Sequence, residues 1–143
     1  LIDFGVRISG YVSDITRILI PSNVDKNYEE LIQVVDEARL NAISAIKSGK
    51  PCSDIDSVAR SVLRSHNVHQ LFIHGLGHGV GIDVHEEPRL GRFSKDYLVE
   101  GDVVTVEPGI YVYGKYGVRI EDLVLVNKNG AQVLSKGPKV IEI

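Results

Sequence analysis

The sequence predicts an α+β domain in which helices cover one face of a mostly antiparallel β-sheet. Three observations predict this fold class: a β-hairpin pattern opens the chain, two helical patterns follow, and strand patterns fill most of the remainder. A chain of 143 residues can form a single domain with a substantial core. Hydrophobic residues make up 43% and charged residues 24%, as in ordinary globular proteins.

The first elements in the chain are a hairpin and a long helix. Residues 1–20 carry apolar and β-branched residues on both sides of an "ISG" turn, and Pro21 ends the pattern. From about residue 25 to residue 47, apolar residues recur at helical spacing. Gly49 suits the end of this helix, so a turn is expected directly after it.

A second, shorter helix is predicted over about residues 54–65, again from the spacing of its apolar residues. Ser53 is followed by Asp56 three positions later, which is the pattern of a capping box. We therefore expect the side chain of Ser53 to cap the start of this helix.

The last third of the chain reads as strands separated by turns. A polar loop is expected over residues 89–101, followed by strands within 102–112 and 116–126. A turn at 127–130 then leads into a short final strand over 131–134.

Charge and composition limit the partners that the chain is expected to bind. The formal net charge is −3, which gives no reason to expect nucleic acid or an anionic membrane as a partner. The sequence shows no apolar stretch of transmembrane length and no signal-peptide pattern. Its single cysteine, Cys52, cannot form an internal disulfide, so a cytoplasmic location is expected.

Two acidic residues are expected to face each other in the first hairpin. If the turn is centred between Ile8 and Ser9, Asp3 lies directly opposite Asp14. Like charges in this position destabilise a sheet, and a divalent cation is the simplest compensation.

The second pair of strands repeats this arrangement. Glu107 and Glu121 flank a loop centred on Gly114, so symmetric pairing places them opposite each other in apolar strands. An unpaired charge there is costly. Each acid taken alone could be a solvent-facing carboxylate, but two such pairs in one small domain suggest a shared site.

The segment "HGLGHGVGIDVHEEP" at residues 74–88 holds His74, His78 and His85, with glycines at alternate positions. Glycine disfavours a helix here and allows close backbone packing and unusual dihedral angles. One imidazole added to four carboxylates makes a two-metal set that suits Mn²⁺, Co²⁺, Fe²⁺ or Zn²⁺. The alternative is a glycine-rich loop in which the histidines are structural.

These motifs resemble those of the pita-bread metallopeptidases, which include methionine aminopeptidase, Xaa-Pro aminopeptidase and prolidase. The matching stretches are "IDFGVRISGYVSDITR", "HGLGHGVGIDVHEEP", "TVEPGIYV" and "GVRIEDLVLV", in the family's order, within residues 2–126. His74 in "HGLGH" and Arg119 in "GVRIED" point to the proline-specific branch, Xaa-Pro dipeptidase or Xaa-Pro aminopeptidase.

The resemblance implies a role for each matching residue. Two divalent metal ions would be bound by five residues: Asp3, Asp14, His78, Glu107 and Glu121. Mn²⁺ or Co²⁺ is the first expectation for these ions, and Fe²⁺ or Zn²⁺ is the alternative. Glu107 would also act as the general base and acid, and His85 would stabilise the tetrahedral intermediate. His74 would contact the proline side of the substrate, and Arg119 would support the site.

The resemblance also implies what surrounds the site. The substrate would be a peptide or dipeptide with proline after the scissile bond, and a homodimer is a family expectation. A pocket for the proline ring is expected near His74. Tyr111 and Tyr113 are candidates to line it, with packing as the alternative.

Residues 1–143 would form the C-terminal portion of a pita-bread catalytic domain, without its N-terminal half or any N-terminal domain. Two helices would then pack on a curved sheet. Two other functions stay open. One is methionine aminopeptidase, against which His74 and Arg119 argue. The other is a non-catalytic binding module or an inactive fragment, against which the full set of five ligands argues.

Overall fold

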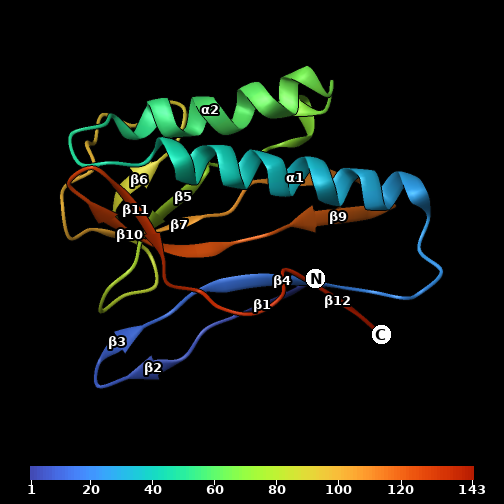
Figure 1. Ribbon diagram of the computed structural model, residues 1–143, viewed down its shortest axis with the longest axis horizontal. Helices are drawn as coiled ribbons and strands as arrows, with labels where there is room; N and C mark the ends of the chain where they lie inside the picture. The colour runs from blue at the N-terminus through green and yellow to red at the C-terminus, as the bar shows by residue number, and fades with distance from the viewer.

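A computed structural model describes residues 1–143 as two helices that cover one face of a set of short β-strands. Helix α1 (Lys26–Ala45) and helix α2 (Cys52–Ser65) lie side by side above the strands (Figure 1). A short 3₁₀ helix, η1 (His69–Leu71), follows α2. The predicted α+β class is confirmed, and both helices lie close to their predicted ranges.

Most strands belong to two sheets. The larger sheet has the order β11–β10–β7–β5–β6 and is antiparallel throughout. Its strands are β5 (Gly77–Gly79), β6 (Glu86–Leu90), β7 (Val103–Val106), β10 (Asp122–Asn127) and β11 (Gly130–Val133). The smaller sheet consists of β1 (Ile2–Phe4), β4 (Ile15–Ile20) and β12 (Val140–Glu142).

Two strand pairs extend these sheets, namely β2 (Arg7–Ile8) with β3 (Tyr11–Val12), and β8 (Gly109–Val112) with β9 (Tyr116–Arg119). Every pairing is antiparallel except that of β12 with β4, so the prediction of a mostly antiparallel sheet is confirmed. Strand β6 was not predicted, because residues 86–90 are polar and only alternately buried. Strand β12 was also missed.

The predicted register of the first hairpin is wrong. Asp3 pairs with Thr16 instead of Asp14, because the turn consists of Ser9 and Gly10 and not of Ile8 and Ser9. Both turn residues have positive φ, 51° and 91°, which is the backbone of a type I′ hairpin turn. Asp14 therefore lies diagonally across from Asp3.

The predicted register of the second hairpin is confirmed on both sides of the two glutamates. Gly109 pairs with Arg119, and Val106 pairs with Asp122, in one continuous alignment. Glu107 and Glu121 lie between these pairs, where neither residue is part of a strand. They face each other across a break in the ladder.

The starts of the two helices differ from each other. Asp25 caps α1, since its carboxylate accepts a 2.7 Å hydrogen bond from the backbone N–H of Asn27. The expected capping box of α2 is absent: the helix begins one residue before Ser53, and its N-cap, Pro51, has no capping side chain. Asp56 is instead fully buried and binds Arg60.

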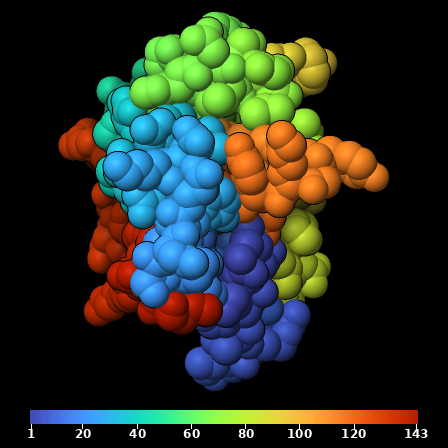
Figure 2. Space-filling view, turned by 90° about the vertical axis from the view of Figure 1, so that its right-hand side faces the viewer, coloured from blue at the N-terminus to red at the C-terminus, as the bar shows by residue number.

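The core lies between the helices and the larger sheet. It contains Val35, Ala38 and Ala42 of α1 and Ile55, Ala59 and Leu63 of α2, packed on residues such as Val104, Ile110 and Val124. Neither helix is long and apolar enough to cross a bilayer. In Figure 2 the orange β8–β9 hairpin protrudes beside the light-blue start of α1, above the blue N-terminal strands.

Candidate metal centre

Six side chains that end in a carboxylate or an imidazole converge at one place in the fold. Three groups each bring their ligand atoms within 4.8 Å of one another: Asp14, His78 and His85; His78, Glu107 and Glu121; Asp3, Asp14 and Glu121. Asp14, His78 and Glu121 each belong to two groups, so the three groups form one cluster. The structure thus brings together all five residues predicted to bind metal.

The break in the ladder between β7–β8 and β9–β10 explains how these segments meet. Pro108 has no backbone N–H, so the regular pairing cannot continue through it. The N–H of Glu107 instead donates to Leu76 O at 2.8 Å, and that of Glu121 donates to Thr16 O at 3.2 Å. Each glutamate is thereby tied to a different neighbouring segment, one that leads to His78 and one that follows Asp14.

Two buried threonines orient the glutamate side chains. Thr16 Oγ1 donates a 2.6 Å hydrogen bond to Glu121 Oε2, and Thr105 Oγ1 donates a 3.1 Å hydrogen bond to Glu107 Oε1. Thr105 also accepts a 3.0 Å hydrogen bond from the N–H of His78. Sequence reasoning missed both threonines, although each lies two positions from an acidic residue and strand side chains alternate with a period of two.

His78 presents a single nitrogen to the cluster. Its Nδ1 lies 2.9 Å from the carbonyl oxygen of Gly79, which can only accept, so Nδ1 carries the hydrogen. Its Nε2 lies 3.3 Å from Glu107 Oε1 and 3.7 Å from Asp14 Oδ2. An imidazole that donates one N–H to a backbone carbonyl, and so directs the other nitrogen at a metal, is the usual arrangement at metal sites.

Burial and neighbouring charges shift the pKa values of several residues in the cluster. Burial and the charge of Glu107 raise the pKa of Glu121 to about 8. Burial and the charge of Asp3 also raise the pKa of Asp14. Although burial lowers the pKa of His78, its hydrogen bonds to Glu107 and Gly79 and the charges of Glu107 and Asp14 outweigh this effect and raise the pKa. Four clustered carboxylates, two of them with raised pKa values, beside one directed imidazole fit divalent cations.

The glycines of the histidine segment allow its backbone to pass very close to other strands. A Cβ on Gly77 would lie 2.0 Å from Thr105 O, and one on Gly79 would lie 2.2 Å from Glu87 O. The expected close packing is therefore confirmed. None of the four glycines has a positive φ, so what glycine supplies here is the close approach of the backbone.

His85 lies at the open side of the cluster. It is exposed, and its ring centroid lies 4.4 Å from that of His78. Its imidazole can therefore reach both the cluster and solvent.

His74 lies at the other end of the site, where protein atoms engage both of its nitrogens. Nδ1 lies 2.7 Å from Gly75 O, and Nε2 lies 2.9 Å from the hydroxyl of Tyr111. Burial lowers the pKa of His74, so the neutral ring donates from Nδ1 and accepts at Nε2. Because both nitrogens have protein partners, His74 can contact a ligand only through its ring carbons.

Arg119 connects this end of the site to the acids. Its guanidinium donates to Asp3, to Thr16 Oγ1 at 3.2 Å and to the hydroxyl of Tyr111 at 3.2 Å. Its Nε also lies 3.8 Å from Glu107 Oε2. Of the two candidate tyrosines, Tyr111 contacts His74 and Arg119, whereas Tyr113 is fully exposed on the β8–β9 turn.

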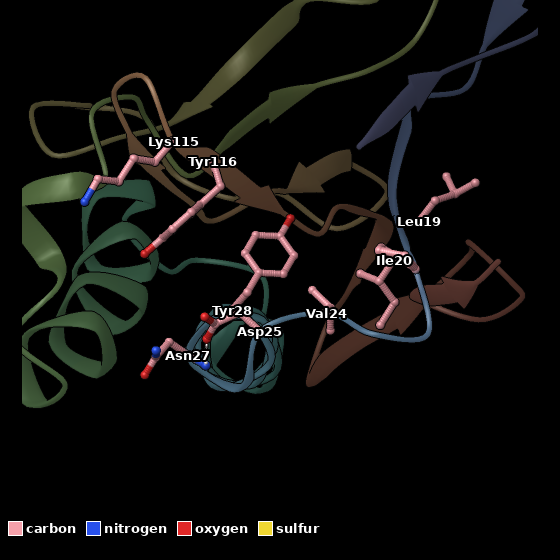
Figure 3. Close-up of a pocket in the computed structure, with 9 residues that line it drawn as sticks. Leu19, Ile20, Val24, Asp25, Asn27, Tyr28, Lys115 and Tyr116 are labelled. Atoms are coloured by element: carbon pink, nitrogen blue, oxygen red, sulfur yellow. Dashed lines mark hydrogen bonds between the residues drawn. The ribbon is translucent and has the colours of Figure 1, made fainter.

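A cavity of about 400 Å³ opens beside the cluster. Its lining includes His74, His78, Arg89, Glu107 and Arg119. The cavity therefore connects the acids predicted to bind metal with the predicted proline side. A larger cavity of about 570 Å³ lies elsewhere, at the start of α1, and contains none of the predicted site residues. Figure 3 shows Tyr28 near its centre, between Tyr116 and Lys115 on one side and Val24, Ile20 and Leu19 on the other.

A buried ion cluster lies directly behind Glu121. Asp122 is fully buried and binds Arg39, Arg17 at 3.1 Å and Lys139 at 2.5 Å. The guanidinium of Arg17 also donates to the backbone oxygen of Glu121 at 2.5 Å. The ion cluster therefore fixes the backbone that carries Glu121.

The chain is similar to known proteins over almost its whole length. The chain is 42% identical over 136 residues to a Xaa-Pro dipeptidase of Pyrococcus furiosus, covering 95% of this chain and 39% of that protein. Its structure matches that of a Thermotoga maritima X-Pro aminopeptidase with a TM-score of 0.95 and 37% identity, covering 99% of this chain and 40% of the other. A prolidase from Pyrococcus furiosus matches with a TM-score of 0.91 and 42% identity, covering 95% and 40%.

The chain thus has the fold seen in pita-bread prolidases, and it spans about 40% of the length of these relatives. The family model described as metallopeptidase family M24 matches residues 1–128. Because that match includes every segment of the cluster, from β1 to β10, the chain belongs to metallopeptidase family M24.

Proposed function

We propose that this chain carries the site of a dinuclear metal-dependent peptidase that hydrolyses the bond preceding proline. The observation that carries the proposal is the convergence of four carboxylates and the Nε2 of His78 within overlapping groups of 4.8 Å. The relatives named Xaa-Pro dipeptidase, X-Pro aminopeptidase and prolidase support the choice of substrate.

Five residues would hold two divalent ions, with Mn²⁺ or Co²⁺ proposed first and Fe²⁺ or Zn²⁺ as alternatives: Asp3, Asp14, His78, Glu107 and Glu121. When bound, such ions supply a water of lowered pKa and polarise the carbonyl that it attacks. Asp14, His78 and Glu121 each belong to two of the three ligand groups. Of these three, only the carboxylates of Asp14 and Glu121 can offer two ligand atoms, because His78 Nδ1 is bound to Gly79 O, so these two acids would be shared by both ions.

The chain's own residues then handle protons and charge. Glu107 accepts a hydrogen bond from Thr105 on Oε1, which leaves Oε2 toward Arg119. We assign it the proton transfer from the attacking water to the leaving proline nitrogen. His85, exposed beside His78, would donate a hydrogen bond to the oxygen on which negative charge develops.

The proline side of the substrate would lie in the cavity of about 400 Å³. His74 lines this cavity with a neutral ring whose nitrogens both have protein partners. Its ring carbons can pack against the proline ring, which has no N–H to bond. Arg119 would support the site from behind through Asp3 and Tyr111.

The direct test is hydrolysis of Xaa-Pro and Met-Xaa peptides by the metal-depleted protein before and after addition of Mn²⁺ or Co²⁺. We expect metal-dependent cleavage of Xaa-Pro peptides and little cleavage of Met-Xaa peptides. The opposite preference would indicate a methionine aminopeptidase. A sample that binds no metal and cleaves neither substrate after metal addition would contradict the proposal and favour a binding module or an inactive fragment.

Variants test the individual roles. Asp14→Ala or Glu121→Ala should abolish metal binding, as measured by metal analysis of the purified protein. His85→Ala should keep both ions and lose most of the activity. A His85 variant with full activity would show that His85 does not stabilise the developing charge.

A further inference from the structure

Arg60 of α2 lies behind His74 and is held rigidly by a carboxylate on its own helix. Its Nε donates to Asp56 Oδ2 at 2.7 Å, and its Nη2 donates to Asp56 Oδ1 at 3.1 Å. Asp56 is fully buried. A two-point contact of this kind fixes the plane of the guanidinium, and not only the position of its charge.

The remaining N–H groups of Arg60 bind the chain on either side of Ile73. Nη1 donates to Phe72 O at 3.0 Å, and Nη2 donates to His74 O at 2.6 Å. Residues 72–76 belong to no helix or strand, so no regular backbone ladder holds them. Arg60 supplies this segment with two anchors that its own backbone lacks.

The side chains form a stack that leads from Arg60 to the site. The guanidinium carbon of Arg60 lies 4.2 Å from the centroid of the buried Phe72 ring. Phe72 in turn meets His74 edge-to-face, with centroids 4.9 Å apart and planes at 86°. The hydroxyl of Tyr111 holds Nε2 of His74 at 2.9 Å.

We propose that Arg60 is a positioning residue for the proline-side wall of the site, and that it sets the selectivity for proline through His74. The inference rests on the proposed function, since it assumes that the His74 ring packs on the proline of the substrate. A ring that recognises its ligand by shape alone must be held in place, because no hydrogen bond to the ligand would correct its orientation.

Arginine is required for this role because of its shape. A lysine keeps the positive charge, but it cannot bind both oxygens of Asp56, donate to two carbonyls and stack on Phe72 at the same time. Arg60→Lys should therefore lose selectivity almost as fully as Arg60→Gln. A purely electrostatic role would instead be rescued by lysine.

The experiment compares Xaa-Pro and Xaa-Ala peptides of equal length with the metal-loaded protein that contains this chain. For Arg60→Lys and Arg60→Gln we expect the ratio of kcat/KM between the two substrates to fall about tenfold. The loss should appear mainly as a higher KM for the Xaa-Pro peptide, with metal content unchanged. Arg64→Gln, an exposed residue one turn later on α2, is the matched control and should keep the native ratio.

Two further measurements distinguish a loss of positioning from misfolding of the Arg60 variants. Arg60→Ala should regain part of its selectivity when millimolar guanidinium is added, because Arg60 lines a second cavity of about 410 Å³ that gives solutes access. Phe72→Leu keeps an apolar side chain but removes the stack, and it should reduce selectivity in the same way.

A third readout does not depend on catalysis. In the metal-free protein, NMR of the His74 imidazole should show an ordered Nδ1–H in the native chain and a mobile ring in the Arg60 variants. Equal losses on both substrates, or an unchanged imidazole, would overturn the proposal. If the native protein cleaves neither peptide, the proposed function fails, and the NMR comparison still decides whether Arg60 positions His74.

Discussion

The hydroxyl of Thr16 donates a 2.6 Å hydrogen bond to Oε2 of Glu121, and both side chains are almost completely buried. This bond stabilises the carboxylate form of Glu121 and lowers its pKa. It acts against burial and the charge of Glu107, which together leave the pKa at about 8. Thr16 therefore keeps a buried acid closer to the charge state that a cation needs.

Thr16→Val should weaken metal binding at neutral pH. The valine side chain has nearly the same shape but cannot donate, so the pKa of Glu121 should rise further. A hydrogen bond to a charged group is worth about 1.5–3 kcal/mol, and a bound metal ion partly replaces it. We therefore expect Mn²⁺ affinity at pH 7 to fall by about tenfold. Titration calorimetry measures this loss, and Thr16→Ser, which keeps the hydroxyl, should stay near the native affinity.

Metal binding should release protons in a pH-dependent way. At pH 7 the metal-free chain holds a proton on Glu121, whose pKa is about 8, and the raised pKa of His78 adds part of another. Ligands bind as deprotonated groups, so we expect about one to two protons released per chain at pH 7 and few above pH 9. Calorimetry in two buffers of different ionisation enthalpy counts these protons; equal release at both pH values would contradict the assignment.

The same group makes the metal-free fold sensitive to pH. The folded chain binds a proton on Glu121 more tightly than the unfolded chain, whose ordinary pKa is near 4.5. Its contribution to stability is therefore fully present below about pH 4.5 and is lost as the pH rises through about 8. Urea unfolding of the chelated protein should show this loss between about pH 4.5 and about pH 8, and saturating Mn²⁺ should remove it.

The sequence predicted the second hairpin better than the first, for a physical reason. Around Gly114 the strands pair symmetrically without a bulge, so Glu107 and Glu121 face each other as expected. In the first hairpin the Ser9–Gly10 turn shifts the register. Ser-Gly is a turn signal of its own, and weighing it more heavily would have placed Asp3 opposite Thr16.

Other parts of the site depend on contacts that no local pattern reveals. The burial of Asp122 requires Arg17, Arg39 and Lys139 to arrive from three distant segments. The spacing of Asp56 from Ser53 fits a cap, while its pairing with Arg60 one turn later is an equally available signal. Tertiary packing decides between these two interpretations.

Tyr111→Phe should impair catalysis while leaving metal binding intact. The change removes a hydroxyl that lies 2.9 Å from Nε2 of His74 and accepts from Arg119 at 3.2 Å. We expect kcat/KM for Xaa-Pro peptides to fall by about tenfold, since groups that orient a site from behind have effects of this order. Tyr113→Phe is the control, because that ring is fully exposed. A Tyr111 variant with native kinetics would remove Tyr111 from the site.

Asp122→Asn should destabilise the fold more than any change at an exposed acid. The neutral amide would leave the buried guanidinium of Arg17 without its counter-charge and would leave Arg39 with Asp36 as its one remaining carboxylate partner. Removing one partner of a buried ion pair costs about 3–5 kcal/mol, whereas an exposed pair is worth about 0–1 kcal/mol. Asp36→Asn, at a partly exposed partner of Arg39, is the matched control. Urea unfolding measures the free energy of unfolding of both variants.

The same variant links the ion cluster to metal affinity. Arg17 donates both to the backbone oxygen of Glu121 and to Asp122, so loss of the Asp122 charge should loosen the backbone that carries Glu121. We expect Mn²⁺ binding by Asp122→Asn to weaken under conditions in which the variant is still fully folded. Native affinity in a folded Asp122→Asn protein would show that the ion cluster stabilises the fold without positioning Glu121, and that Thr16 alone holds the carboxylate in place.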